Sequence, residues 1–317
     1  MIKPGNASAY IKIARFDHWI KQLFILPGFW LAIKMVGTTE TAYHIILVLL
    51  LGLLCTSAAA SANYCINEWL DSKFDKFHPV KKNRPFVVGK LNPFIVLTEY
   101  LCFAVLALII AFNVSINVLI MILILLVLGL LYNVYPIRTK DLPYIDVLSE
   151  SLNNVIRLVI GWFCVTNVYL PPVSIVCGYW MGGAFLMAAK RFAEYRMIGD
   201  PAQASLYRKS FGIYNENLLL LSTVFYGFLA VFFSGVFLVK YRIELLIFIP
   251  FLCGLFCYYL GLCFKQDSAA QKPEKLFREK WLMLYVGFLI ALFVFLHYVN
   301  IPVFEVFLQL DLARLPQ

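Results

Sequence analysis

Residues 67–75 read Asn-Glu-Trp-Leu-Asp-Ser-Lys-Phe-Asp and close an apolar stretch, 43–66, that is long enough to cross a membrane. Residues four apart lie on one face of a helix, so Asn63, Asn67, Asp71 and Asp75 form a single stripe of oxygen ligands. Magnesium ions prefer such oxygens and are usually held by one or two carboxylates together with the phosphates of a substrate. The spacing therefore predicts Mg²⁺ as the cofactor, with Asn67, Asp71 and Asp75 as its ligands.

Three cationic residues, Lys81, Lys82 and Arg84, follow this stripe. Cationic side chains can neutralise the phosphate charge that a metal ion leaves uncompensated. We expect Lys81 and Arg84 to act in catalysis together with the stripe, and Lys82 to bind substrate. The alternative is a solvated helix end whose charged residues only cap and pair. Charges at a membrane boundary usually serve a function, which favours a site for a diphosphate.

The composition of the chain is that of an integral membrane protein. Of 317 residues, 62% are hydrophobic and 14% are charged, and the mean hydropathy is +0.81. Nine apolar stretches lack the alternation of a β-barrel, so we predict an all-α, polytopic bundle in one domain, residues 1–317. The stretches cover about residues 19–36, 43–66, 93–112, 116–135, 146–167, 172–190, 216–239, 243–264 and 280–300.

Lys and Arg residues are distributed unevenly between the two sides of these stretches. Twenty-two of the 27 lie in the N-terminal segment or in connections on the same side. The positive-inside rule then places the N-terminus and the site in the cytoplasm and the C-terminus outside a cell membrane. Because the net charge of +9 belongs to one membrane face, we expect the lipid bilayer as a partner and no nucleic acid. We expect no signal peptide, and no disulfide or zinc pattern among the eight cysteines.

The fifth stretch carries a polar stripe of its own, formed by Asp146, Glu150, Asn153, Asn154 and Arg157. Charged groups within a membrane helix face a cavity or a partner, so we expect this helix to line the binding pocket. The alternative is that Glu150 and Arg157 pair with each other and only fasten helices together.

Two further cations, Arg138 and Lys140, follow Pro136 at the end of the fourth stretch. Proline ends a helix, so both side chains are expected at the membrane surface, as candidate substrate-binding groups or as ordinary positive-inside residues.

The sixth stretch ends in Lys190, Arg191, Glu194 and Arg196, with Asp200 beyond them. Glu194 and Asp200 are six residues apart and point in different directions on a helix, so they do not form a second acidic pair. A cationic segment with one carboxylate suits a substrate with an additional phosphate and several hydroxyls.

Several of these motifs resemble the UbiA superfamily of intramembrane prenyltransferases. They are the Asn67-x-x-x-Asp71-x-x-x-Asp75 register, Lys81-x-x-Arg84-Pro, Tyr135-Pro136 and the number of apolar stretches. The run from Lys190 to Glu194, Lys-Arg-Phe-Ala-Glu, is similar to the decaprenyl-phosphate phosphoribosyltransferase branch. Two features depart from that branch: Glu68 stands where it usually has Asp, and Pro136 stands where it usually has Ser.

The resemblance implies a Mg²⁺-dependent transfer of 5-phosphoribosyl from phosphoribosyl diphosphate to a polyprenyl phosphate, with release of diphosphate. It also implies substrate-binding roles for the cations near the membrane surface. Lys190, Arg191 and Arg196 would hold the 5-phosphate, and Glu194 would contact ribose hydroxyls or a second metal. The lipid phosphate would meet Arg157 or Lys140. The remaining candidates for substrate binding are Lys21, Lys82 and Arg138.

Two other functions compete with this interpretation. A prenyltransferase that moves an isoprenoid to an aromatic or other acceptor would share the fold and the first motif, but would need a second acidic pair. A transporter would spread its ionisable groups along a path, whereas here they gather at one face. The apolar helix surfaces are also compatible with a homo-oligomer, and the sequence does not decide between one chain and several.

Overall fold

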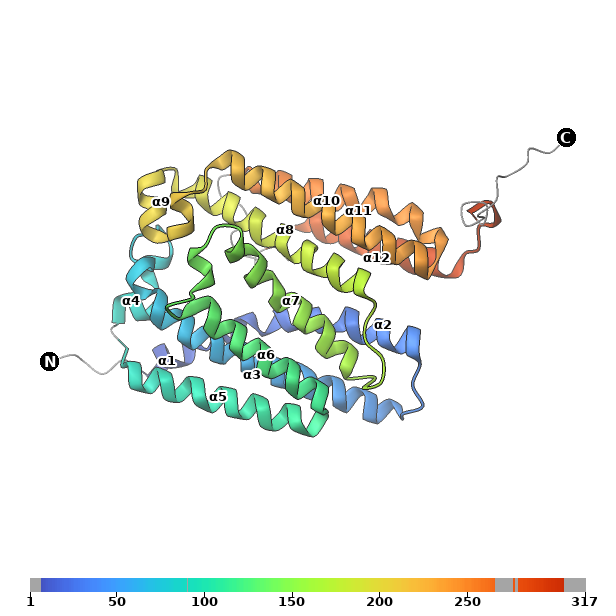
Figure 1. Cartoon of the computed structure of the whole chain (residues 1–317), viewed down its shortest axis with the longest axis horizontal. Coiled ribbons are helices and arrows are strands. Elements are labelled where there is room, and N and C mark those ends of the chain that lie inside the picture. Colours follow the sequence, from blue (N-terminus) through green and yellow to red (C-terminus); the bar gives the residue numbers. More distant parts are fainter. Residues whose placement is uncertain (1–6, 90, 266–275, 277–278, 305–317) are drawn as a thin grey trace. The chain divides into compact units, whose positions relative to one another are not determined.

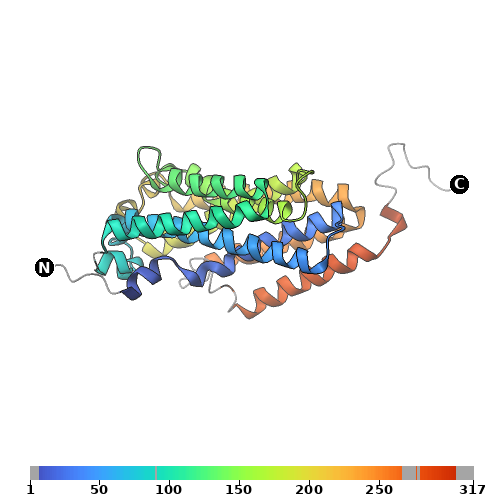
Figure 2. The same ribbon diagram turned by 90° about the horizontal axis from the view of Figure 1, so that it is seen from below.

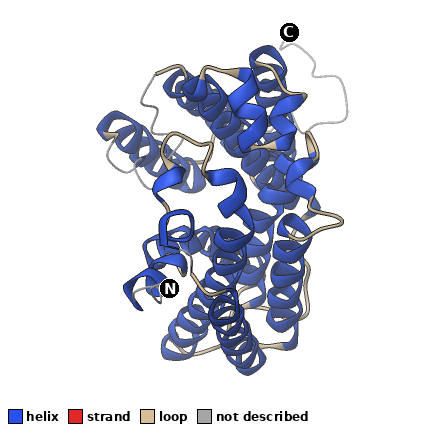
Figure 3. Ribbon diagram, turned by 90° about the vertical axis from the view of Figure 1, so that its left-hand side faces the viewer, coloured by secondary structure: helices blue, strands red, loops and turns tan. Residues whose placement is uncertain are grey.

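The computed structural model describes residues 7–89, 91–265, 276 and 279–304. Within these residues every regular element is a helix, so the predicted all-α class is confirmed (Figure 3). The chain divides into two compact units, residues 1–171 with 198–218, and residues 172–197 with 219–317. The prediction of a single domain stays a prediction.

The first unit contains most of the polar motifs. Its elements are α1 (Ala7–Ile13), η1 (Phe16–Ile25), α2 (Leu26–Val36), α3 (Ala42–Asp75), η2 (Lys81–Asn83), α4 (Pro85–Gly89), α5 (Pro93–Val114), α6 (Ile116–Asn133), η3 (Thr139–Asp141), α7 (Ile145–Phe163), α9 (Pro201–Tyr207) and η4 (Lys209–Gly212). The second unit contains α8 (Val173–Ile198), α10 (Glu216–Tyr241), η5 (Ile243–Ile247), α11 (Phe248–Cys263) and α12 (Lys280–Tyr298), although the last residue of α8 and the first turn of α10 belong to the first unit.

Eight helical segments among the described residues are long and apolar enough to cross a membrane. The predicted stretch 146–167 forms α7 but is not one of them, because it carries Asp146, Glu150 and Arg157. The predicted count of nine spans is therefore not confirmed. The predicted span 19–36 is also not one uniform helix, since a 3₁₀ segment, η1, gives way to α2 just before Pro27. Proline lacks an N–H and clashes with the preceding turn, so it fits at the start of an α-helix and not inside one.

Helix α3 is the central element of the first unit and carries the acidic stripe. It runs without interruption for 34 residues, and Thr41 Oγ1 caps its start by accepting a hydrogen bond from the His44 N–H. It packs against α5 and α6, which run beside it in both side views (Figure 1, Figure 2). Its buried run from Cys55 to Ala62 consists only of Cys, Thr, Ser and Ala. Such small side chains let neighbouring backbones approach closely.

Helices α2 and α7 meet at two glycines. A Cβ atom on Gly28 would collide with the Leu158 carbonyl oxygen, and one on Gly161 would collide with the Ile25 carbonyl oxygen. The two backbones are thus in direct contact, which holds η1 and α2 against the polar helix α7.

Candidate active site

The acidic stripe lies on one unbroken helix, as predicted. Asn67, Asp71 and Asp75 occupy successive turns at the C-terminal end of α3, and Asp75 is buried. One turn earlier, Asn63 donates from Nδ2 to the Leu125 carbonyl oxygen at 3.0 Å and so ties α3 to α6. The stripe therefore begins in the packed part of the unit and ends among charged loops.

Asp71 receives two cations from the connection between α6 and α7. Its Oδ1 accepts from Arg138 Nη2 at 3.0 Å and from Lys140 Nζ. Lys140 also donates to Asn133 Oδ1 at 2.7 Å. Burial lowers the pKa of the Lys140 ammonium to about 8, although the Asp71 carboxylate opposes that shift. The sequence named both cations as candidates, and the structure brings them to one carboxylate oxygen.

Arg138 is held in this position by several contacts. Its Nε donates to Asp141 Oδ1 at 3.2 Å, and its guanidinium lies over the Phe74 and Tyr135 rings at 4.7 and 5.0 Å from their centroids. Its backbone is left-handed, with φ of 30°. A left-handed conformation in a residue with a Cβ is unfavourable and persists where surrounding contacts hold it. The backbone is strained at the residue whose guanidinium reaches Asp71.

Asp75 pairs with a different arginine. Arg84 Nη1 donates to Asp75 Oδ2 at 2.5 Å, and Arg84 Nε lies 3.8 Å from Glu68 Oε2. Glu68 Oε2 in turn accepts from Arg15 Nη2 at 2.6 Å. These four residues form a chain of alternating charge from the N-terminal segment to the end of α3.

The remaining cations behind the stripe differ in environment. Lys81 donates to the Tyr207 hydroxyl, and its ammonium lies 4.7 Å from the centre of that ring. The turn before it is fixed by His78, whose Nδ1 accepts from the Val80 and Lys81 N–H groups at 3.1 Å each. Lys82, by contrast, is exposed to solvent. Lys81 and Arg84 are thus oriented by their neighbours, and the proposed role of Lys82 stays a prediction.

Helix α7 begins with a carboxylate that anchors the segment after α9. Asp146 is fully buried, and its oxygens accept from Arg208 Nη1 and Tyr214 OH at 2.9 Å and from Ser210 Oγ at 3.3 Å. Glu150 accepts from Tyr132 OH at 2.8 Å. This end of the polar stripe holds the unit together, a role that the sequence did not indicate for Asp146.

The other end of the stripe pairs with η1. Arg157 Nε donates to Gln22 Oε1 at 2.7 Å, and its Nη1 donates to Asn154 Oδ1 at 3.3 Å. Beside Gln22, the Lys21 ammonium lies 3.1 Å from His18 Nδ1. The proposed substrate contacts of Arg157 and Lys21 stay predictions.

Four predicted residues, Lys190, Arg191, Glu194 and Arg196, lie on α8 in the second unit. Arg191 and Glu194 are buried, and the Arg196 guanidinium lies over the Phe192 and Phe264 rings. Their binding roles stay predictions.

Asp200 has a structural role. Its Oδ1 accepts from the Ala202 N–H at 2.9 Å and caps the start of α9. An aspartate used in this way is a poor candidate for a second acidic pair, in agreement with the sequence spacing.

The donor set fits Mg²⁺ that shares its ligands with a substrate. In the described part of the chain, no group of three or more His, Cys, Asp or Glu side chains could hold a metal by itself. Two carboxylates and an amide on α3 supply hard oxygen atoms, which suit Mg²⁺ when phosphates and water complete its coordination.

Two residues that the structure adds to this site, Arg15 and Glu68, were not among the residues predicted from the sequence. Glu68 lies seven residues before Asp75, two turns away on the same face of α3, and that spacing could have identified it. Arg15 could not be found in this way, because it lies 53 residues from Glu68.

Comparison with known proteins agrees with this geometry. Residues 23–285 match the UbiA prenyltransferase family. The chain belongs to this family. It is therefore a member of a transferase family and a multi-pass membrane protein.

Individual relatives are distant. The chain is 25% identical to the nodulation protein NoeC of Azorhizobium caulinodans over 232 residues, 72% of this chain and 71% of that protein. It is 26% identical to a protoheme IX farnesyltransferase of Bacillus mycoides over 187 residues, 56% of this chain and 59% of that enzyme.

Solved structures share the fold. A UbiA homolog from Archaeoglobus fulgidus, bound to DMAPP and Mg²⁺, has a TM-score of 0.66 at 18% identity, covering 89% of this chain and 98% of that one. An apo UbiA homolog from Aeropyrum pernix K1 has a TM-score of 0.60 at 14% identity, covering 87% and 98%.

Proposed function

We propose that this UbiA-family protein transfers 5-phosphoribosyl from phosphoribosyl diphosphate to a polyprenyl phosphate and requires Mg²⁺. The observation that carries this proposal is the convergence of three cations on one acidic pair. Asp71 and Asp75 are met by Arg138, Lys140 and Arg84. A site in which several cations gather at one pair of carboxylates suits a donor rich in phosphate.

The proposed reaction exchanges one C–O bond for another. The bond between ribose C1 and the diphosphate breaks, and the diphosphate leaves with the electron pair. An oxygen of the lipid phosphate forms the new bond to C1. Because that phosphate is already an anion, no general base is needed. The main task of the protein is to stabilise charge on the leaving diphosphate.

Each residue of the site has a role in that task. Asn67, Asp71 and Asp75 would hold Mg²⁺, which supplies Lewis-acid stabilisation of the diphosphate when bound. Arg84 and Lys81, which contact Asp75 and Tyr207 in this structure, would donate to diphosphate oxygens. Arg138 and Lys140 already converge on Asp71 and need only small side-chain movements to donate to an anion beside it.

The remaining substrate contacts belong to the same proposal. The 5-phosphate would be held by α8 cations, ribose hydroxyls by Glu194, and the lipid phosphate by Arg157 or Lys140. Lys82 and Lys21 would add positive charge that attracts the anionic substrates. We place the site on the cytoplasmic side of the cell membrane, because most of the Lys and Arg residues share its face.

A prenyltransferase is the second candidate, and the relatives favour it. Farnesyltransferases match more than half of this chain, and a structure with the same fold contains DMAPP and Mg²⁺. The acidic pair on α3 would serve a prenyl diphosphate equally well. Against it, Asp200 caps α9, so a second acidic pair would have to come from elsewhere.

Turnover with two donors distinguishes the candidates. Purified protein in detergent, with Mg²⁺, is given polyprenyl phosphate and phosphoribosyl diphosphate labelled in the ribose. We expect label in the organic phase, lost with EDTA and with Asp71→Asn. Asp200→Asn is the matched control: asparagine still caps a helix, so activity should stay within about twofold of wild type. Consumption of a labelled prenyl diphosphate instead, with no labelled ribosyl lipid, would replace this proposal with prenyl transfer.

A further inference from the structure

Glu68 is a buried carboxylate beside the candidate active site with no assigned role in the reaction. Its side chain is 2% exposed, and Oε2 accepts from Arg15 Nη2 at 2.6 Å. The second oxygen, Oε1, is buried and has no hydrogen-bond partner among the described residues. Buried polar atoms are nearly always paired because leaving one unpaired is unfavourable. The unused oxygen of Glu68 therefore points to a partner that this arrangement does not yet engage.

Besides Arg15, a second cation, Arg84, lies beside the Glu68 carboxylate. Its guanidinium lies between two carboxylates, with Nη1 2.5 Å from Asp75 Oδ2 and Nε 3.8 Å from Glu68 Oε2. Asp75 and Glu68 are two helical turns apart on the same face of α3. A small movement of the Arg84 guanidinium along α3 would exchange its contact with Asp75 for one with Glu68.

This exchange matters because Asp75 cannot bind both Arg84 and a metal ion through the same carboxylate oxygen. While Arg84 donates to Oδ2, the guanidinium competes with any metal ion for that carboxylate. A second carboxylate within reach gives the arginine another acceptor and keeps it beside the diphosphate.

We propose that Glu68 is a positioning residue that draws Arg84 away from Asp75 when the site takes up a divalent cation and a diphosphate. This inference rests on the proposed function, in which Asp75 is a metal ligand. Glu68 thereby leaves Asp75 available and directs the remaining Arg84 donors to the diphosphate.

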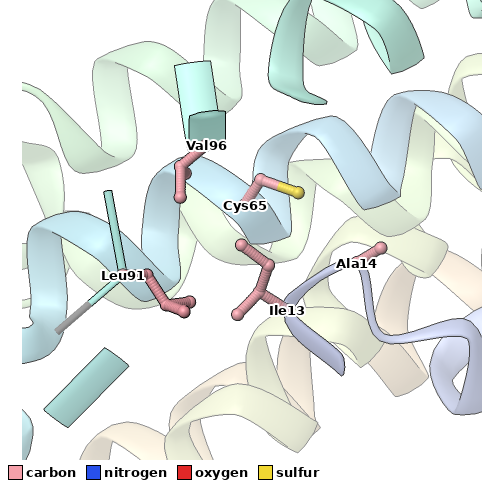
Figure 4. Close-up of a cluster of buried hydrophobic side chains, with 5 residues drawn as sticks. All are labelled: Ile13, Ala14, Cys65, Leu91 and Val96. Atoms are coloured by element: carbon pink, nitrogen blue, oxygen red, sulfur yellow. The ribbon is translucent and has the colours of Figure 1, made fainter. Parts of the chain in front are cut away.

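Arg15 holds Glu68 in place for this role. Its backbone is left-handed, with φ of 52°, and the two residues before it, Ile13 and Ala14, pack with Cys65 of α3 in a buried apolar cluster (Figure 4). Cys65 lies three residues before Glu68 on the same helix. The N-terminal segment is thus fixed to α3 next to Glu68, so that Arg15 binds Oε2 and Oε1 keeps its capacity to accept a hydrogen bond.

The test measures Mn²⁺ binding and not turnover. Full-length protein in detergent is titrated with Mn²⁺ and inorganic diphosphate, and bound metal is followed by the enhancement of water-proton relaxation. Glu68→Gln is expected to raise the apparent Kd for Mn²⁺ about tenfold, and Glu68→Asp to stay within about threefold of wild type. Glu99→Gln, which removes another carboxylate from this unit, is expected to leave binding unchanged.

A double variant separates positioning from a general effect of charge. If Glu68 acts through Arg84, Glu68→Gln has no further effect in an Arg84→Gln background. Additive effects, or unchanged Mn²⁺ binding by folded Glu68→Gln, would overturn the inference while the proposed function stands. If wild-type protein bound no Mn²⁺ in the presence of diphosphate, both the inference on Glu68 and the proposed function would be overturned.

Discussion

Two arginine clusters, one in each unit, show how similar groups can serve different purposes. In the first unit Arg138 and Lys140 converge on one oxygen of Asp71. In the second unit Arg242 joins the start of η5 to the end of α12. Its Nε donates to Glu244 Oε2 at 3.0 Å, and its other nitrogens donate to the His297 and Val299 carbonyl oxygens and to Asn300 Oδ1.

The difference lies in how the positive charge is satisfied. Arg242 meets one carboxylate and the carbonyl groups that end α12, so its charge and donors are used within the fold. Around Asp71 two cations share one carboxylate oxygen. Donors used by carbonyl groups stabilise helix ends, whereas cations that gather at one carboxylate can attract an anion.

The largest effect is expected from Asp71→Asn. This change removes a proposed metal ligand and the carboxylate that Arg138 and Lys140 share, so turnover should fall at least about 100-fold. The thermal unfolding midpoint should also fall, because Arg138 and Lys140 are buried and lose the carboxylate that they share, so turnover is compared per folded molecule. Labelled-product assays and thermal unfolding in detergent measure the two quantities. Near-normal turnover would show that the cations gathered at Asp71 do not mark the site.

Arg242→Ala should lower stability without lowering turnover. Loss of several charge-assisted hydrogen bonds at the end of α12 is expected to lower stability by about 2 kcal/mol, seen as a lower unfolding midpoint. Turnover per folded molecule should be unchanged. Lys240→Ala, an exposed neighbour, is the control and should leave the unfolding midpoint near that of wild type. If Arg242→Ala abolished turnover in fully folded protein, the contrast between the two clusters would fail.

Gly161→Ala tests the scaffold of the first unit itself. The added methyl group would meet the Ile25 carbonyl oxygen where α7 contacts η1 and α2. We expect destabilisation by about 1–3 kcal/mol from overpacking, with the Mg²⁺ dependence of turnover unaltered in the folded fraction. Gly37→Ala does not serve as its control, since Gly37 has φ of 79°. Gly182→Ala does, because a Cβ there meets nothing within 4 Å. A changed Mg²⁺ dependence in Gly161→Ala would mean that the site and its scaffold are not separable.

The smallest effect is expected from Lys209→Ala. Its side chain is 54% exposed and lies 3.6 Å from Asp141 Oδ2. Solvent screens such a pair, so turnover should stay within about twofold of wild type. Steady-state kinetics at low and high salt provide the measurement. A large loss of turnover would show that the exposed Lys209 belongs to the functional cluster together with Arg138 and Lys140.

Much of the candidate site follows from local spacing. The register of Asn67, Asp71 and Asp75 depends only on the period of a helix, and α3 confirms it. The same period predicted that Asp200 and Glu194 do not share a helix face, while the cap that Asp200 makes on α9 came from the structure. The sequence also predicted a membrane protein, because an apolar stretch near twenty residues has few other uses.

The sequence was less informative about the polar residues of helix α7. Helix α7 was predicted as a membrane span, but its three charged residues exclude it from the segments apolar enough to qualify. Asp146 was expected in a pocket wall, whereas three donors from residues 208–214 surround it. A polar stripe shows that a helix has polar neighbours, but it does not say whether those neighbours are substrate or protein.

By itself, therefore, the sequence determined the helical class, the membrane setting and the acidic stripe, because each depends on residues within one segment. Only the tertiary structure decided which cation meets which carboxylate. Lys140 is 69 residues from Asp71, and Arg15 is 53 residues from Glu68. Such pairs depend on how α3 packs against other parts of the first unit, and no periodicity along the chain records that packing.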